Sequence, residues 1–226
     1  MEIKAVFFDI DGTLVNDSRA VLKSTEKAIQ SLKEEGIYVG LATGRGPAFV
    51  KPFMERYGFD FAVTYNGQYI VTKDRVLFTS PIDKKSLHQL IDYAQKHRKE
   101  IALGTKDGVF GSRIMSFGMS PISTWSSRFV PRKMARTVSR GFNKVVSKVV
   151  PQDQKILYAL AQEPIYQVLI LSSPEETAKI EKEFPDLKFT RSSPFAAEVL
   201  NPGISKLEGL RIVGPEFGFD IDDVMA

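Results

Sequence analysis

The chain has 226 residues, contains no cysteine and carries a formal net charge of +4 at neutral pH. That length can bury a full hydrophobic core, either in one large domain or in two modest ones. The lack of cysteine excludes a disulfide scaffold, a Cys-ligated zinc site and a thiol nucleophile. No apolar run approaches the length of a membrane span and no secretory signal pattern follows Met1, so we expect a cytoplasmic protein without membrane contact.

Strands and helices alternate in the pattern of the first 80 residues. Apolar runs and helical periodicity predict strands at 3–8, 37–42 and 60–64, helices at 18–35 and 46–57, and a hairpin at 68–72 and 75–79. Because parallel strands are joined by crossover helices, this order predicts a doubly wound parallel sheet of the α/β class. Ligands bind at the carboxyl ends of such strands.

Two acidic residues follow the first predicted strand. Asp9 and Asp11 are separated by one residue and lead into a turn at Gly12. One such carboxylate can attack an electrophile while the other transfers a proton, provided that a cation suppresses their repulsion. The alternative is an ordinary Asp-Gly turn with both acids in solvent. The apolar strand before the pair, and Thr13 and Leu14 after it, favour chemistry.

A hydroxyl, a glycine and a guanidinium follow the second predicted strand, as Thr43, Gly44 and Arg45. Thr43 can donate to a phosphoryl oxygen, Gly44 lets the backbone come close, and Arg45 offers a planar fork that suits phosphate. The same residues also fit a helix N-cap threonine followed by a surface arginine.

Asn66 and Gly67 follow the third predicted strand. Because Asn-Gly between two strand-like segments is typical of a hairpin turn, the pair predicts such a turn here.

The pattern changes at Pro81. Helices are predicted at 84–97 and 174–184, and strands at 100–104, 109–115, 165–171, 187–191 and 195–200. Helices and strands that return on themselves in this way indicate an α+β domain. We therefore expect a domain at 81–198 that is inserted into a core domain made of 1–80 and 199–226.

The inserted segment contains a strongly basic stretch. Residues 108–152 include no acidic side chain and eight basic ones, which are Arg113, Arg128, Arg132, Lys133, Arg136, Arg140, Lys144 and Lys148. Five of these recur every four residues from 132 to 148, so they would form one stripe on a helix. Such a stripe is either a solvated surface or a positive field that attracts an anionic substrate. No nucleic-acid motif accompanies it, so we expect no nucleic-acid partner.

A further turn precedes the last predicted helix. Pro202 and Gly203 are followed by Ser205, which can N-cap a helix that begins near Lys206. On its own, a lysine in this position is a solvated first-turn residue that the helix dipole slightly disfavours.

Taken together, these segments resemble the haloacid dehalogenase-like (HAD) superfamily of phosphohydrolases. The stretch 9–14 matches the DxDGT(L/V) motif, 41–45 matches LxTGR, which is typical of the Cof-like branch, and 198–206 matches E(V/I)xxxGxxK. The inserted α+β domain and its length are similar to the class IIB cap domain of that branch.

The resemblance implies a role for each of these residues. Asp9 would attack phosphorus and form an aspartyl-phosphate, and Asp11 would act as acid and then as base. Thr43 and Lys206 would hold the phosphoryl group and offset its charge. The implied substrate-side residues are Gly12, Gly44, Arg45 and Asn66. Mg²⁺ is the implied cofactor, with Asp9 and Asp11 as metal ligands.

The family's fourth motif, GDxxND, which completes the Mg²⁺ site, has no match in this sequence. The segment 222–226 is instead similar to the lead-in to the strand that carries this motif. We therefore expect the C-terminal part of the core domain to be incomplete in this sequence. Because Mg²⁺ takes several oxygen ligands, we also expect its binding to be weakened.

These patterns lead us to expect a Mg²⁺-dependent phosphatase that hydrolyses a small phosphorylated metabolite, a sugar phosphate or a similar compound, as a monomer or weak homodimer. Two alternatives remain open. A phosphomutase would use the same pair of aspartates, and a protein with an impaired metal site would bind phosphate for regulation without turnover.

Overall fold

The computed structural model of the protein describes residues 2–15, 20–111 and 154–226. The chain divides into two compact units. The first unit comprises Met1–Ser80, Lys106–Gly108 and Gly203–Ala226, and the second comprises Pro81–Thr105 and Val109–Pro202.

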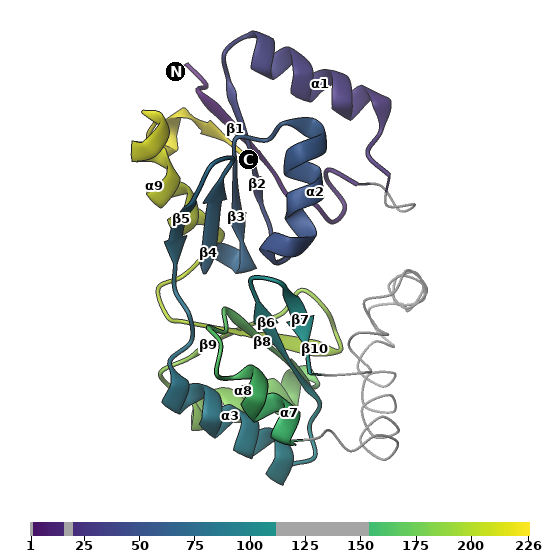
Figure 1. Cartoon of the computed structure of the whole chain (residues 1–226), viewed down its shortest axis with the longest axis vertical. Helices are drawn as coiled ribbons and strands as arrows, with labels where there is room; N and C mark the ends of the chain where they lie inside the picture. The colour runs from purple at the N-terminus through teal and green to yellow at the C-terminus, as the bar shows by residue number, and fades with distance from the viewer. Residues whose placement is uncertain (1, 16–19, 112–153) are drawn as a thin grey trace. The chain divides into compact units, whose positions relative to one another are not determined.

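The first unit is built on a six-stranded sheet with the strand order β11-β1-β2-β3-β4-β5 (Figure 1). Its elements are β1 (Ala5–Phe8), α1 (Lys23–Glu34), β2 (Tyr38–Ala42), α2 (Pro47–Tyr57), β3 (Phe61–Thr64), the 3-10 turn η1 (Tyr65–Gly67), β4 (Tyr69–Thr72), β5 (Val76–Thr79), α9 (Lys206–Phe217), the 3-10 turn η2 (Ile221–Asp223) and β11 (Val224–Met225). Strands β11, β1, β2 and β3 are parallel, and β4 and β5 are antiparallel additions. The predicted α/β class and its parallel sheet are confirmed.

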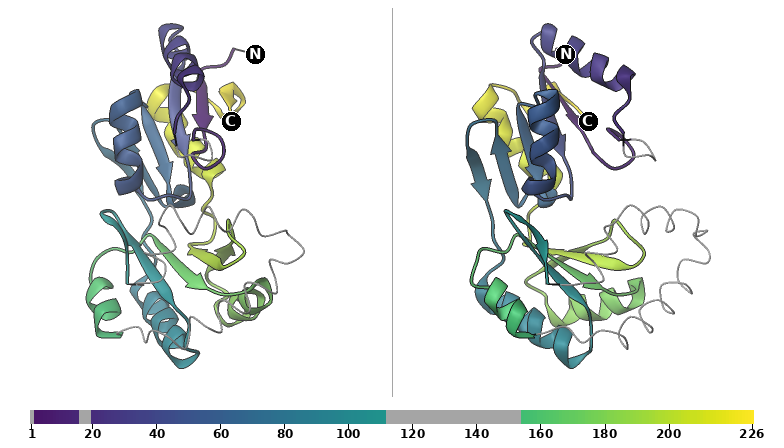
Figure 2. Two further views of the ribbon diagram at one scale, coloured as in Figure 1. Left: turned by 90° about the vertical axis from the view of Figure 1, so that its right-hand side faces the viewer. Right: turned by 45° about the vertical axis from the view of Figure 1, so that its right-hand side comes forward.

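Helices cover both faces of this sheet, and Figure 2 shows the same layers from two further directions. Under α1 and α2 lies an apolar cluster that includes Ile29, Val39, Leu41, Val50 and Met54. Under α9, on the opposite face, lies a cluster that includes Phe7, Phe61, Val63, Leu210 and Val213. The alternation of side chains along β2 and β3 therefore supplies two separate cores, one for each face.

The strand register brings two functional candidates to one edge of the sheet. Phe8, at the end of β1, lies level with Leu41 of the parallel strand β2. Asp9 and Thr43, which follow these strands directly, therefore leave the sheet at the same edge. At the C-terminal end, β11 pairs in parallel with β1, so Val224 and Met225 form an edge strand of this sheet, and the resemblance of this segment to the lead-in to the fourth motif stays a prediction.

The second unit is built on a five-stranded sheet with the order β7-β6-β8-β10-β9. Its elements are α3 (Lys84–Lys96), β6 (Ile101–Thr105), β7 (Gly108–Phe110), α7 (Gln154–Leu160), β8 (Gln167–Leu171), α8 (Pro174–Glu183), β9 (Lys188–Thr190) and β10 (Ala196–Leu200). Helices α3, α7 and α8, which lie in the described part of this unit, pack on one face of the sheet, where the core includes Leu87, Leu90, Ile91, Leu157, Val168, Ile180 and Val199. No helix in the described parts of either unit is long and apolar enough to cross a membrane.

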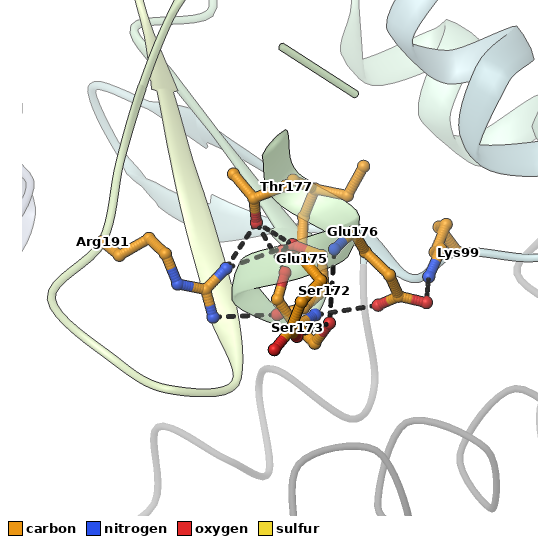
Figure 3. A network of polar contacts seen from close by, with 8 residues as sticks. Lys99, Ser172, Ser173, Glu175, Glu176, Thr177 and Arg191 are labelled. Atoms are coloured by element: carbon orange, nitrogen blue, oxygen red, sulfur yellow. Dashed lines mark hydrogen bonds and ion pairs between the residues drawn. The ribbon is translucent and has the colours of Figure 1, made fainter. Parts of the chain in front are cut away.

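A polar network in the second unit ties the β9–β10 connection to the start of α8 (Figure 3). The Arg191 guanidinium donates to the backbone oxygens of Ser172 at 2.9 Å and Pro194 at 2.7 Å, and to the Thr177 hydroxyl. Ser173 caps α8 beside it. Because a guanidinium can donate to several carbonyl oxygens at once, Arg191 holds this connection against the residues that precede α8.

The structure differs from the sequence prediction at helix α7 and at the end of the second unit. Helix α7 was not predicted. The predicted return to the core domain at 199 comes too early, because β10 pairs with β9 as far as Leu200 and the first unit resumes at Gly203. The basic stripe predicted at 132–148 lies outside the described residues.

Candidate active site

The turn after β1 presents Asp9 and Asp11 at the carboxyl edge of the sheet. Ile10 and Leu14 are buried in the core, and the Leu14 N–H donates to the Asp9 carbonyl oxygen at 3.0 Å. Gly12 has a φ of 87°, which glycine adopts without strain. With the apolar residues turned inward, the two carboxylates stay 43% and 53% exposed, so an incoming ligand can reach both.

Lys206 contacts Asp9 from the first turn of α9. Its Nζ lies 3.1 Å from Asp9 Oδ1, and the Ile10 N–H donates to the same oxygen at 2.9 Å. The helix start is fixed as predicted, since the Ser205 hydroxyl accepts a hydrogen bond from the Glu208 N–H at 3.1 Å. Both contacts that the described residues make with the Asp9 carboxylate thus fall on Oδ1.

Thr43 is buried at the end of β2. Its N–H donates to the Val63 carbonyl at 2.9 Å, and its own carbonyl accepts from the Asn66 N–H at 3.0 Å. The Thr43 hydroxyl accepts a hydrogen bond from the Arg45 N–H at 3.1 Å. A hydroxyl that already accepts can still donate its proton to another acceptor, such as a phosphoryl oxygen.

Arg45 forms a two-pronged ion pair with Asp11. Its Nε donates to Oδ2 and its Nη2 to Oδ1, each at 2.9 Å, in the bidentate geometry that gives strong charge-assisted hydrogen bonds. The fork that we predicted for phosphate is therefore occupied by a carboxylate, and phosphate binding by Arg45 stays a prediction. No sequence pattern indicated this pair, because its partners lie 34 positions apart.

The Asn66-Gly67 turn joins β3 to the antiparallel strand β4, as the hairpin prediction requires. Tyr65 and Asn66 have φ values of 47° and 55°, which side-chain-bearing residues seldom adopt. The Tyr65 N–H donates to the Arg45 carbonyl at 3.0 Å, and burial raises the pKa of the Tyr65 hydroxyl, which stays protonated. Gly67 lies against the Ser205 backbone. The η1 turn therefore contacts both the loop that follows β2 and the segment that begins α9.

The chain matches the family model described as haloacid dehalogenase-like hydrolase over residues 6–226. It belongs to this family. It is 27% identical over 226 residues to "Putative phosphatase YkrA" of Bacillus subtilis, and the match covers all of this chain and 79% of that protein. Curated relatives of this kind, together with the family match, make the chain a phosphatase of the haloacid dehalogenase-like type.

Solved structures share the fold of this chain. A hypothetical protein from Geobacillus kaustophilus is 29% identical, with a TM-score of 0.71 over 98% of this chain and 78% of that one. The HAD subclass IIB sugar phosphatase BT4131 is 21% identical, with a TM-score of 0.73 over 98% of this chain and 78% of that one. At that identity, the second likeness concerns the fold.

All the site residues that the sequence of this haloacid dehalogenase-like phosphatase suggested lie in the first unit. They are Asp9, Asp11, Gly12, Thr43, Gly44, Arg45, Asn66 and Lys206. Glu198, which opens the last matching motif, lies instead in β10 of the second unit, where Gln167 donates to its carboxylate at 3.4 Å. A motif that is continuous in sequence is therefore divided between the two units.

The described residues hold no group of three or more His, Cys, Asp and Glu side chains that could bind a metal ion. The carboxylates of Asp9 and Asp11 nevertheless are hard, exposed oxygen donors at the ligand-binding edge. Mg²⁺ is commonly bound through one or two carboxylates, with water and substrate phosphate as its other ligands. The donor set therefore fits Mg²⁺.

Proposed function

We propose that this phosphatase is a Mg²⁺-dependent phosphomonoester hydrolase that acts on a small phosphorylated metabolite, a sugar phosphate or a similar compound, through an aspartyl-phosphate on Asp9. The observation that carries the proposal is the contact between Lys206 Nζ and Asp9 Oδ1 at 3.1 Å. It joins a carboxylate and a cation at the carboxyl edge of a parallel sheet, where a phosphoryl group can meet both.

In the first proposed step, Asp9 attacks phosphorus. Because Lys206 and the Ile10 N–H both engage Oδ1, Oδ2 is the oxygen available to attack. The new bond joins Oδ2 to phosphorus while the bond from phosphorus to the leaving oxygen breaks. Holding Oδ1 from two directions fixes the rotation of the carboxylate, so the attack needs little reorganisation.

Asp11 handles the protons in this proposal. In its protonated form it gives a proton to the leaving oxygen, and the alcohol departs. The carboxylate that results then takes a proton from water, whose oxygen attacks phosphorus and releases phosphate from Asp9. Asp11 ends the cycle protonated again, and it can serve both steps because its side chain is 53% exposed at the site edge.

Positive and polar groups offset the charge on the transferring phosphoryl group. Lys206 brings a full positive charge, and the Thr43 hydroxyl can donate to an equatorial oxygen. When bound, Mg²⁺ would be held by Asp9 and Asp11 and would supply further positive charge at the phosphoryl oxygens. Its remaining ligands would be water and the substrate phosphate.

The test is phosphate release from a panel of sugar phosphates and p-nitrophenyl phosphate, in Mg²⁺ and in EDTA, with the variant Asp9→Asn. Asp223→Asn is a matched control, because Asp223 also pairs with a lysine (Lys4 Nζ to Oδ2, 2.9 Å) but lies beside the amino end of β1. We expect Asp9→Asn to lower release by roughly a thousandfold or more. The Asp223→Asn variant should release phosphate at the unaltered rate.

Three results would overturn the proposal. Release that survives in Asp9→Asn would remove Asp9 as the nucleophile. Release that persists in EDTA would remove the Mg²⁺ requirement. If the unaltered chain released no phosphate from any member of the panel in Mg²⁺, the hydrolase assignment would fail. The same assay separates a hydrolase from a phosphomutase, because a mutase returns the phosphoryl group to its product.

A further inference from the structure

The charged side chains of the candidate site form two separate ion pairs. Lys206 lies against Asp9, and Arg45 holds Asp11 through two N–H groups, each 2.9 Å from a different carboxylate oxygen. The formal charges of these four side chains cancel. Arg45 therefore supplies at Asp11 both a positive charge and two charge-assisted hydrogen bonds.

This pairing affects how the site takes up Mg²⁺, for which the proposed function uses Asp9 and Asp11 as ligands. Both Asp11 oxygens face the Arg45 fork, one toward Nε and the other toward Nη2. Each oxygen has a further lone pair. A cation bound there would nevertheless lie within a few ångströms of the guanidinium charge, and like charges repel strongly at that separation. Mg²⁺ and Arg45 therefore compete for Asp11.

The Phe49 ring keeps the Arg45 side chain beside the site. Phe49 lies in the first turn of α2, and the centre of its ring is 4.8 Å from the Arg45 guanidinium carbon. The attraction between a guanidinium and an aromatic face does not depend on which anion the N–H edge holds. Arg45 can therefore exchange one anion for another while it stays on the ring.

The charges of the two incoming ions favour such an exchange. Near neutral pH a phosphomonoester carries nearly two negative charges, and Mg²⁺ carries two positive ones. Either ion alone would leave the site with an uncompensated charge. Together they leave it close to neutral, as the four side chains are by themselves. Binding of either ion should therefore favour binding of the other.

We propose that Arg45 is the counter-ion that Mg²⁺ displaces from Asp11, and that the displaced fork then binds the phosphoryl group, so that Arg45 couples metal binding to phosphate binding. This proposal rests on the proposed function for the choice of Asp11 as a metal ligand. Because such coupling is reciprocal, bound phosphate draws Arg45 away from Asp11 and tightens Mg²⁺ binding by the same factor. Arg45 thereby disfavours a site that holds only one of the two ions.

The test measures the binding of Mn²⁺, which takes the same oxygen ligands as Mg²⁺ and whose unbound form gives an EPR signal. Arg45→Gln removes the charge and the fork, whereas Arg45→Lys keeps the charge but cannot hold both oxygens in the same way. Arg56→Gln is the matched control, because it makes the same change in the last turn of α2, where Arg56 Nη2 lies 3.8 Å from Glu26 Oε1. Each protein is measured without and with inorganic phosphate, after urea denaturation has shown that it is folded.

The variants should differ in a definite order. Without phosphate, we expect Arg45→Gln to bind Mn²⁺ roughly fivefold more tightly than the unaltered chain, and Arg45→Lys roughly twofold more tightly. Arg56→Gln should bind Mn²⁺ as the unaltered chain does. Added phosphate should tighten Mn²⁺ binding by the unaltered chain. This gain should shrink roughly threefold or more in Arg45→Gln, because that variant has no fork to release.

A second readout follows Arg45 itself in the unaltered chain. The ¹⁵N NMR signal of the Arg45 Nε–H group, identified by its loss in Arg45→Lys, should shift when Mg²⁺ saturates the protein and shift again when phosphate is added. An unshifted signal, or equal Mn²⁺ affinities in Arg45→Gln and Arg56→Gln, would overturn the proposal. If Arg45→Gln tightened binding and Arg45→Lys did not, the effect would be one of charge alone, and the exchange at Asp11 would also be refuted.

Failure of the proposed function would give a different result. If no variant bound Mn²⁺, with or without phosphate, the Mg²⁺ requirement would fail and the role of Arg45 would fail with it. If the unaltered chain bound Mn²⁺ and released phosphate from its substrates, but the Arg45 variants bound Mn²⁺ like the control, only the proposal on Arg45 would fail. The hydrolase assignment would then stand.

Discussion

The contact between the η1 turn and the start of α9 allows a sharp test of how the site is assembled. Gly67 has a φ of 109°, and a Cβ added there would come within 2.4 Å of the Ser205 backbone oxygen and 3.3 Å of Ile204 Cγ2. A backbone oxygen cannot rotate aside as a flexible side chain can. The substitution Gly67→Ala must therefore push Ser205 and the adjoining Lys206 away from the turn.

The expected loss of stability in Gly67→Ala is the sum of two free-energy costs. A side chain in left-handed backbone costs about 1–2 kcal/mol. Forcing an extra carbon into a packed contact costs a further 1–3 kcal/mol or so. We therefore expect Gly67→Ala to lower the free energy of unfolding by about 2–5 kcal/mol. Because Lys206 must stay near Asp9, a small displacement should also lower phosphate release about tenfold or more.

Gly36→Ala is the matched control. Gly36 also has a left-handed φ, of 77°, but a Cβ added there meets nothing within 4 Å. It should lose only the conformational cost of about 1–2 kcal/mol and keep full phosphate release. Urea denaturation and the phosphate assay on both variants provide the measurement. If Gly67→Ala were as stable and as active as Gly36→Ala, the turn would not hold α9 in place, and our reading of this contact would be wrong.

Two further predictions concern the second unit. Arg191→Met keeps the length of the side chain but leaves the Ser172 and Pro194 oxygens without their donor, so we expect a loss of about 2–4 kcal/mol in urea denaturation. Arg211→Met, which removes an exposed pair within one helix, should cost less than about 0.5 kcal/mol, and equal losses would contradict the structural role of Arg191. Asp83→Ala removes the N-cap of α3 and should cost about 1 kcal/mol at pH 7. The hydrogen bond from Ser86 holds the pKa of Asp83 below its ordinary value of 3.8, so this stability is present above that pH and is lost as the pH falls through the lowered pKa. Denaturation at pH 5 and pH 3 should show the gap between the two proteins shrinking, and a constant gap would exclude the charged cap as its source.

The features that the sequence predicted well depend on residues close together in the chain. The apolar run before Asp9 made a strand that delivers both aspartates to a turn, and Ser205 capped the helix that begins at Lys206. Asn66 and Gly67 made the predicted hairpin between β3 and β4. Local backbone preference and hydrophobic periodicity determine such features, so a single sequence contains them.

Other features were decided only when distant segments came together. The sequence marked Arg45 as a phosphate ligand, but the fold places Asp11 within reach of its fork and the Phe49 ring beneath it. Strand β10 continues the sheet of the second unit, although its sequence opens a motif that ends in the first. A side chain's partner depends on which strands lie next to each other. The order of the strands depends on packing across the whole sheet, which no single segment of the sequence shows. The sequence therefore determined which chemical groups the site contains, and the tertiary structure determined which of these groups are in contact.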